Sequence, residues 1–247
     1  MTTSFNGHGE YPNDPPPRND PPKVLVLCGS PRREGNSWLL AEAFAEGSLE
    51  AGHECELVYL SDYVKELLRD CRKCRRPDGS CSIDDRFEEL FFEKALPADA
   101  WIYATPLWWY GTSALLKNFF DRIFCYISPA MYSGLVPTKT GDKVLEELPG
   151  KRGALLMSAE ETNFGGRLAV LTQIQECCRY MHHPFVGFIT GVGTSRNDVK
   201  ADPSRPLDAA RDMGRRLFEI RETNYDLVIP RPKKLWEGQD HYPAIWR

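Results

Sequence analysis

A short loop of small and polar residues follows the first apolar run of the chain. Residues 29–37 read GSPRREGNS, come directly after the apolar residues 24–28, and precede an amphipathic run that begins at Trp38. Where a strand ends in such a loop and a helix begins, the first backbone N–H groups of the helix have no partner within it, and the helix dipole is positive there. Such a position stabilises an anion, above all a phosphate.

The donors of this first loop suit a phosphate monoester that is bound without a metal ion. The loop differs from the fingerprint GxGxxG and from the P-loop GxxxxGK[ST], whose lysine accompanies a nucleoside triphosphate and magnesium. One cation and three neutral groups supply its side-chain donors: Arg32, Ser30, Asn36 and Ser37. Flavin mononucleotide (FMN) is a common ligand of this kind on a doubly wound sheet. The plain alternative is an ordinary turn in which Asn36 or Ser37 caps the helix.

A second unusual loop, TPLWWYG at residues 105–111, follows the apolar run 100–105. Its aromatic side chains and a turn ending in glycine offer stacking surface and backbone hydrogen-bonding groups to a planar ligand. Packing in the core or at an interface is the alternative for these aromatic residues. Because ligands of open parallel sheets bind at the carboxyl ends of the strands, beside the switch point, we expect both loops to line one crevice.

The elements that must position these loops alternate along the chain. Apolar runs at 23–28, 54–60, 100–105, 153–158 and 185–190 predict five strands. Between and after the strands, the spacing predicts a helix from Ser37 to Gly52, a short helix over 63–68, and a helix from Asp84-Asp85 to about Ala95. Three further helices are predicted by apolar stripes at 116–123, 171–181 and 210–217. This pattern predicts a doubly wound α/β fold with parallel strand order 2-1-3-4-5 and helices on both faces.

The α/β pattern covers residues 23–221, is interrupted at 127–149, and leaves two terminal segments outside it. Residues 1–22 are polar and rich in proline, which predicts a disordered tail. Residues 127–149 show little periodicity, so we interpret them as an insertion. Residues 222–247 contain Trp236, Tyr242, Ile245 and Trp246, and we expect this extension to pack on the body or on a second subunit.

The composition of the chain argues against nucleic acid and membranes as binding partners. The chain has 247 residues and a net charge of −4, without a basic field for nucleic acid. Its apolar runs are far shorter than the roughly 20 residues that span a bilayer, and no apolar signal core begins the chain. We therefore expect a soluble cytoplasmic protein with no nucleic-acid or membrane partner, in which the eight cysteines are reduced thiols.

Taken together, these segments resemble the NAD(P)H-dependent FMN reductase family of flavodoxin-like proteins, nearest the branch that includes the iron–sulfur flavoproteins. The resemblance covers about residues 23–221. It rests on stretches that occur in the right order: the first loop, a cysteine-bearing loop that ends in Asp84-Asp85, Ala98-Asp99-Ala100, TPLWW at 105–109, and LKNFFDR at 116–122.

The resemblance implies a flavodoxin-like fold with non-covalent FMN, NAD(P)H as co-substrate, and a homodimer or a tetramer of dimers. It implies that the FMN phosphate meets Ser30, Arg32, Asn36 and Ser37. It places the flavin ring against Pro106, Leu107, Trp108, Trp109, Tyr110 and Gly111, and against Ala159, Glu160 and Asn163 after the fourth strand. No side chain is expected to act as a catalytic acid or base, because the flavin carries the chemistry.

The cysteine-bearing loop departs from the iron–sulfur members of the family, which carry C-x-x-C-x-x-C and a fourth cysteine shortly after. Cys71, Cys74 and Cys81 fit this pattern, but Pro77 stands where the third cysteine belongs. Three thiolates do not complete the usual four-cysteine ligation of a cluster, and structural zinc also takes four ligands. We therefore expect no iron–sulfur cluster and no metal site.

Other interpretations of this loop stay open. A remote thiol, Cys55 or Cys125, would complete a cluster. Cys71 and Cys74 would form a redox dithiol whose pKa the neighbouring cations lower. A basic loop with relic cysteines is the plainest interpretation.

The expected function is an FMN-dependent oxidoreductase. It takes hydride from NAD(P)H and passes electrons to a small organic acceptor, such as a quinone, an azo or nitro compound, or a biosynthetic intermediate. One alternative is a flavodoxin-type electron carrier or an iron–sulfur flavoprotein that docks to a protein partner. Another is a flavin-binding sensor or structural subunit. Small electron-carrying flavodoxins are shorter and markedly acidic, which favours the enzyme.

Overall fold

The computed structural model describes residues 20–69, 76, 81–132, 143–144 and 146–220. Its centre is a parallel sheet of β1 (Lys23–Cys28), β2 (Glu54–Tyr59), β3 (Ala100–Pro106), β4 (Arg152–Ala159) and β5 (Phe185–Val192). The strand order is β2-β1-β3-β4-β5, which confirms the predicted topology. Since all neighbouring pairs are parallel, the loops after the strands gather at one edge.

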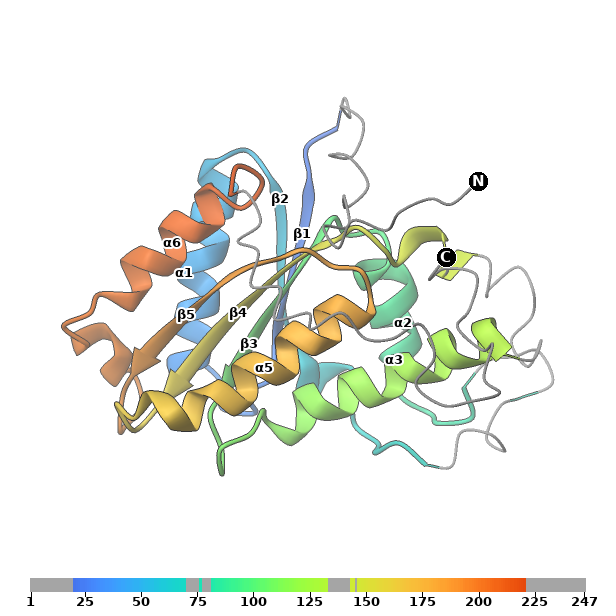
Figure 1. Cartoon of the computed structure of the whole chain (residues 1–247), viewed down its shortest axis with the longest axis horizontal. Coiled ribbons are helices and arrows are strands. Elements are labelled where there is room, and N and C mark those ends of the chain that lie inside the picture. Colours follow the sequence, from blue (N-terminus) through green and yellow to red (C-terminus); the bar gives the residue numbers. More distant parts are fainter. Residues whose placement is uncertain (1–19, 70–75, 77–80, 133–142, 145, 221–247) are drawn as a thin grey trace, which may run out of the picture.

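Helices cover both faces of this sheet (Figure 1). α1 (Asn36–Glu50) and α6 (Pro206–Arg215) lie on one face, whereas α3 (Ala114–Tyr132) and α5 (Phe164–Tyr180) lie on the other. The second face also carries α2 (Phe87–Glu89), which continues as a π-helical segment, η2 (Leu90–Ala95). Short 3-10 turns, η1 (Leu60–Asp62) and η3 (Asp198–Ala201), follow β2 and β5.

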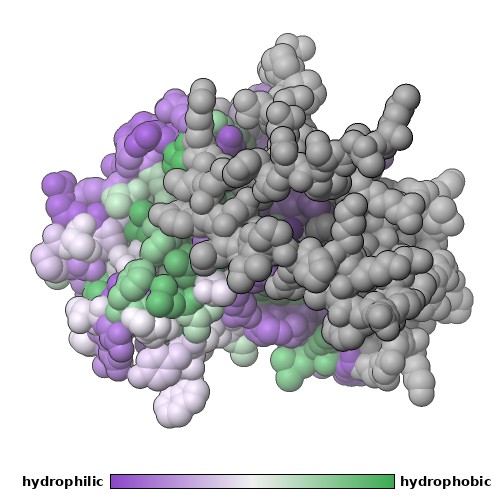
Figure 2. All heavy atoms as spheres, in the orientation of Figure 1, coloured by the Kyte–Doolittle hydropathy of each residue, from purple (hydrophilic) through white to green (hydrophobic). Residues whose placement is uncertain are grey.

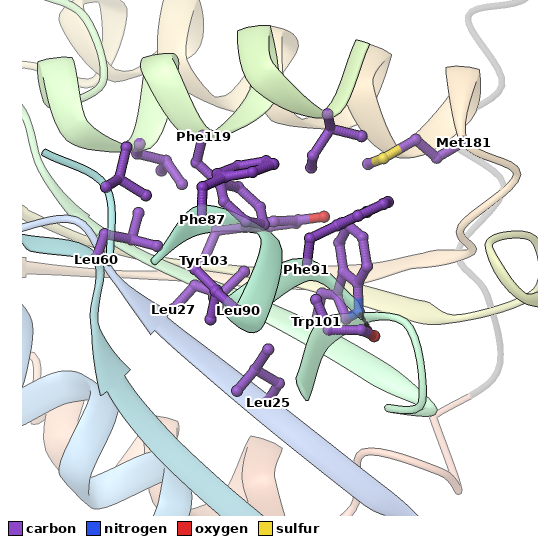
Figure 3. Packing of buried hydrophobic residues seen from close by; sticks show 14 of the residues in the cluster. Leu25, Leu27, Leu60, Phe87, Leu90, Phe91, Trp101, Tyr103, Phe119 and Met181 are labelled. Carbon is purple, nitrogen blue, oxygen red and sulfur yellow. Dashed lines mark hydrogen bonds between the residues drawn. The ribbon is translucent and has the colours of Figure 1, made fainter. Parts of the chain in front are cut away.

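Strand alternation divides the core between the two faces. Leu25 and Leu27 of β1 pack with the aromatic residues of β3, η2 and α3, as Figure 3 shows. Val24 and Val26 point to the opposite face and pack with α1 and α6. Because β1 and β3 are buried on both faces, they are continuous apolar runs, as is typical of the central strands of a parallel sheet.

Two predicted elements are wrong. Residues 63–68 are not helical, because backbone N–H groups of this segment bond to side chains distant in sequence: Lys65 N donates to Asp85 at 3.0 Å and Leu68 N donates to Asn118 at 3.0 Å. Residues 127–132 belong to α3, which continues through Pro129, so the first part of the expected insertion is helical, and residues 133–142 and 145 lie outside the described residues. The terminal segments 1–19 and 221–247 lie outside the described residues.

The surface in Figure 2 is hydrophilic over α6, and hydrophobic residues gather between α6 and α5, where β5 forms the edge of the sheet. Within the part of the chain that the structure describes, no helix has the length and apolarity to cross a membrane.

Candidate functional site

The first loop and the loop after β3 lie side by side at the carboxyl edge of the sheet, as predicted. Gly29 N donates to Ala104 O at 2.8 Å, and a Cβ at Gly29 would lie 2.7 Å from Ser113 Oγ. Glycine is therefore required for this close approach. The guanidinium of Arg32 lies over the ring of Trp108, 5.8 Å from its centroid. The structure thus joins the two loops that sequence reasoning paired.

The start of α1 presents backbone N–H groups that no described side chain caps. Gly35 is the N-cap, with extended backbone, so neither Asn36 nor Ser37 takes that position. Ser30 lies beside this helix start, only 3% exposed, and its Oγ accepts from Arg32 N at 3.2 Å. An uncapped N-terminus of a 15-residue helix, beside a buried hydroxyl and an exposed arginine, fits the phosphate of FMN.

Ser37 is held by a neighbouring strand and Asn36 by the segment after β5. Ser37 Oγ lies 2.7 Å from Ser158 Oγ of β4, and both residues are buried. Asn36 Nδ2 donates to Ser195 O at 2.9 Å, and Asn36 Oδ1 accepts from Val199 N at 3.4 Å. The Asn36 amide therefore ties the first loop to the segment after β5.

Arg32 and Arg33, adjacent in sequence, have different surroundings. Arg33 forms an ion pair with Asp62 and stacks over the Tyr59 ring at 4.0 Å, while Tyr59 stacks on Trp38. The ion pair with Asp62 raises the pKa of the Arg33 guanidinium. Arg32 is exposed, and its guanidinium lies over the Trp108 ring without forming an ion pair to any residue that the structure describes. Arg32 is thus the cation of this loop that is available to a ligand.

Residues 108–111 form a tight turn, which we call the aromatic turn. Trp108 N donates to Gly111 O at 3.1 Å and Gly111 N donates to Trp108 O at 3.0 Å. The two residues between them have positive φ, 47° at Trp109 and 60° at Tyr110, a combination that normally requires Asn-Gly. Trp109 is 96% exposed and Tyr110 is 53% exposed. Strained backbone and exposed aromatic side chains occur together mainly where a ligand or partner binds.

The loop at residues 159–163, which we call the β4 loop, borders the aromatic turn. Leu107 N donates to Ser158 O at 2.7 Å, so the segment after Pro106 continues along β4. Tyr110 packs so closely on the first turn of α5 that a Cβ at Gly166 would lie 2.9 Å from its ring. Ala159 is buried, Glu160 is exposed, and Asn163 Oδ1 caps α5 by accepting from Gly165 N at 2.9 Å. The three predicted loops are thus neighbours.

Sequence reasoning missed a buried ion pair near Cys81, the last residue of the cysteine-bearing loop. Arg122 of α3 and Asp85 are almost fully buried, and Arg122 Nη2 lies 2.8 Å from Asp85 Oδ1. Burial alone would raise the pKa of Asp85, but hydrogen bonds from Arg122 and from backbone N–H groups lower it. One turn earlier in α3, Asn118 Nδ2 donates to Glu66 O at 2.8 Å. Both residues belong to the LKNFFDR stretch, whose spacing could have indicated a shared face.

Cys81 and Cys28, two of the described cysteines, have separate surroundings. Cys71 and Cys74 lie outside the described residues, so the expectation of no cluster stays a prediction. Cys81 is buried, its N–H donates to Glu88 at 2.9 Å, and its Sγ lies 4.0 Å from Arg122 Nη2. At the end of β1, burial raises the pKa of Cys28 to about 11, which keeps that thiol protonated at neutral pH.

The sheet order, the helices on both faces and the three loops at the switch point define a flavodoxin-like α/β protein. The chain belongs to the NADPH-dependent FMN reductase family, whose model matches residues 22–189. It is thus an NAD(P)H-dependent FMN oxidoreductase.

Relatives agree with this assignment. The chain is 29% identical over 206 residues to an iron–sulfur flavoprotein of Methanocaldococcus jannaschii, covering 80% of this chain and 96% of that protein. It is 24% identical over 189 residues to a Bacillus subtilis protein named as an NAD(P)H-dependent FMN-containing oxidoreductase, covering 76% and 95%. Among solved structures, an NAD(P)H:quinone oxidoreductase from Methanothermobacter marburgensis superposes with a TM-score of 0.57 at 26% identity, covering 81% of this chain and 98% of that one.

Proposed function

We propose that the protein binds one FMN at the carboxyl edge of its sheet and passes electrons from NAD(P)H to a small organic acceptor. When bound, FMN supplies the redox chemistry by accepting hydride and releasing electrons. The observation that carries the proposal is the juxtaposition of the uncapped start of α1 with a strained, exposed aromatic turn. A phosphate and a planar ring are the two parts of one flavin mononucleotide.

The first loop is assigned to the phosphate. Backbone N–H groups at the start of α1, the hydroxyls of Ser30 and Ser37 and the guanidinium of Arg32 are its donors. The Asn36 side chain has backbone partners already, so we assign Asn36 through its own backbone N–H rather than its amide. The sequence contains no dinucleotide fingerprint GxGxxG, which favours FMN over FAD.

The flavin ring is assigned to residues 106–111 and to Ala159, Glu160 and Asn163. Trp108, Trp109 and Tyr110 are all exposed, so they can cover a planar ligand without rearranging the core. A quinone or an azo or nitro compound has the shape to stack on such a ring. The name of the quinone oxidoreductase at 26% identity is consistent with that class of acceptor.

An electron carrier that docks to a protein partner is the second candidate. It is favoured by the name of the iron–sulfur flavoprotein at 29% identity and by the presence of Cys81 beside Arg122. A flavodoxin-type carrier needs only the flavin, whereas an iron–sulfur flavoprotein also requires a cluster on the cysteine-bearing loop, whose pattern lacks the third cysteine at Pro77. For the enzyme we also propose a homodimer or a tetramer of dimers, which a measurement of the molar mass in solution would test.

Two experiments separate these candidates. Chromatography of heat-released flavin should give FMN in near one-to-one amount, and recovery of FAD alone would overturn the assignment. Stopped-flow mixing with NADPH, followed by a quinone under anaerobic conditions, should bleach the flavin absorbance and then restore it. Bleaching that only a protein partner reverses would favour the electron carrier.

A further inference from the structure

Arg167 is a buried cation in the first turn of α5. It is 7% exposed. Its Nη1 donates to Thr190 Oγ1 of β5 at 2.8 Å, and its Nη2 donates to Glu161 O of the β4 loop at 2.6 Å. Its Nε is buried and has no hydrogen-bond partner within the part of the chain that the structure describes. Arg167 therefore braces the β4 loop against β5 and keeps one unused donor inside the protein.

This placement is electrostatically unfavourable for a cation. Burial removes the guanidinium from water, and the start of α5 carries the positive end of the helix dipole. The first turn of α5 contains no acidic residue, and among the described residues no carboxylate forms an ion pair with Arg167. Buried charges are normally paired, so an unpaired one indicates that an anion is present in another state of the protein.

The carboxylates nearby are engaged elsewhere. Asp202 accepts from Val192 N at 2.6 Å and from Ser204 Oγ at 2.7 Å. Burial would raise its pKa, but these hydrogen bonds and the charge of Arg167 lower it. Glu160 and Glu161 of the β4 loop are exposed, and Arg167 contacts only the backbone oxygen of Glu161. These acids leave the Arg167 charge without a direct partner.

We propose that Arg167 stabilises the negative charge that the flavin ring acquires on reduction, and so sets the reduction potential of the bound FMN. The inference rests on the proposed function, because the β4 loop is one of the segments assigned to the ring. Arg167 contacts that loop through Glu161, and its helix turn contacts Tyr110 of the aromatic turn through Gly166. Arg167 is thus a positioning residue whose charge acts through the loop.

The charge balance follows from the hydride. NAD(P)H gives up a hydride, which is two electrons and one proton, and leaves as NAD(P)⁺. The neutral oxidised flavin gains both electrons with that one proton, so the ring system carries one additional negative charge until a second proton or the acceptor arrives. A fixed cation near the ring favours this state over the oxidised state.

The test measures the affinities of oxidised and reduced FMN for wild type, Arg167→Gln and Arg167→Lys. We expect Arg167→Gln to lower the preference for reduced over oxidised FMN at least tenfold, which is about 30 mV for a two-electron couple. Arg167→Lys keeps the charge and should stay within about twofold of wild type. Arg179→Gln is the matched control, because Arg179 is an exposed arginine near the end of the same helix, and it should change nothing.

If the Arg167→Gln variant fails to fold, a measurement on wild type alone still tests the charge of the reduced ring. Between about pH 5.5 and 7.5, the potential of bound FMN should fall by about 30 mV per pH unit, as one proton per two electrons requires. A fall twice as steep would show that the reduced ring is neutral and would overturn the proposal. An unchanged preference in Arg167→Gln with FMN bound would also overturn it. Failure of every form to bind FMN would instead refute the proposed function.

Discussion

Replacing Trp109-Tyr110 by Asn-Gly tests whether the aromatic turn is strained for the sake of a ligand. Both residues have positive φ, and such a conformation costs about 1–3 kcal/mol for each bulky residue. Asn-Gly adopts it at little cost. Trp109 is 96% exposed, so its removal sacrifices almost no packing, whereas Tyr110 loses its contact with Gly166, worth about 1 kcal/mol. Taking about 1.5 kcal/mol for each residue, in the lower half of that range, and subtracting the lost contact, the double variant should gain about 2 kcal/mol in free energy of unfolding.

For a domain of this size, that gain raises the melting temperature by about 4–8 °C. Calorimetry of the FMN-free protein measures it, and fluorescence titration of the same sample measures FMN binding. We expect FMN affinity to fall about tenfold or more, because two stacked aromatic contacts are lost. Phe124→Asn is the matched control: Phe124 is a half-exposed aromatic residue in the helix α3, and its replacement should give no stabilisation. A turn variant that is no more stable than wild type, with unchanged FMN affinity, would refute the reasoning.

The other predictions concern charged side chains and the cysteine-bearing loop. Arg32→Ala should weaken FMN binding about tenfold in a fluorescence titration, because a charge-assisted hydrogen bond is worth about 1.5–3 kcal/mol, whereas Arg33→Ala, whose guanidinium is paired with Asp62, should have a smaller effect. Arg122→Met should cost about 3–5 kcal/mol in urea unfolding at pH 7, because Asp85 remains buried without its partner. Since the folded-state pKa of Asp85 is lowered, wild type should lose the contribution of this ion pair as the pH falls through and below about 4, and the two proteins should then converge. Anaerobically purified protein should contain no stoichiometric iron and sulfide, and near-stoichiometric values would show that a remote cysteine completes a cluster. The cysteine-bearing loop carries four basic side chains, Arg72, Lys73, Arg75 and Arg76. Neutralising them together should raise the KM for NADPH and leave FMN affinity intact, because their charges attract the phosphates of the nicotinamide cofactor. An unchanged KM would exclude this role in NADPH binding.

The sheet could be predicted because its strands are short apolar runs separated by helical spacing, and parallel crossovers restrict their order. The segment 63–68 could not be predicted, because its backbone groups bond to Asp85 and Asn118, which lie about 20 and 50 residues away. Local propensity carries no information on such contacts. The continuation of α3 through Pro129 likewise runs against the local signal of proline.

The site was predictable in position and less so in detail. Loop composition placed the first loop and the aromatic residues at one edge, but Trp-Tyr is not a turn sequence, so the strain at Trp109 and Tyr110 becomes visible only in the backbone angles. Arg167 did leave a signal. It lies on the same helical stripe as Leu171, Ile174 and Cys178, at a position where a charged residue should not be buried without a function.

The central claim is that the carboxyl edge of this sheet holds a flavin mononucleotide that NAD(P)H reduces. The most direct test is anaerobic stopped-flow reduction of the reconstituted protein by NADPH or NADH, in parallel with chromatography of the heat-released flavin. We expect about one FMN per protein chain, full bleaching of the flavin absorbance by a nicotinamide cofactor, and recovery of that absorbance when a quinone is added. A protein that retains no FMN after reconstitution, or whose bound FMN neither nicotinamide reduces, would contradict it.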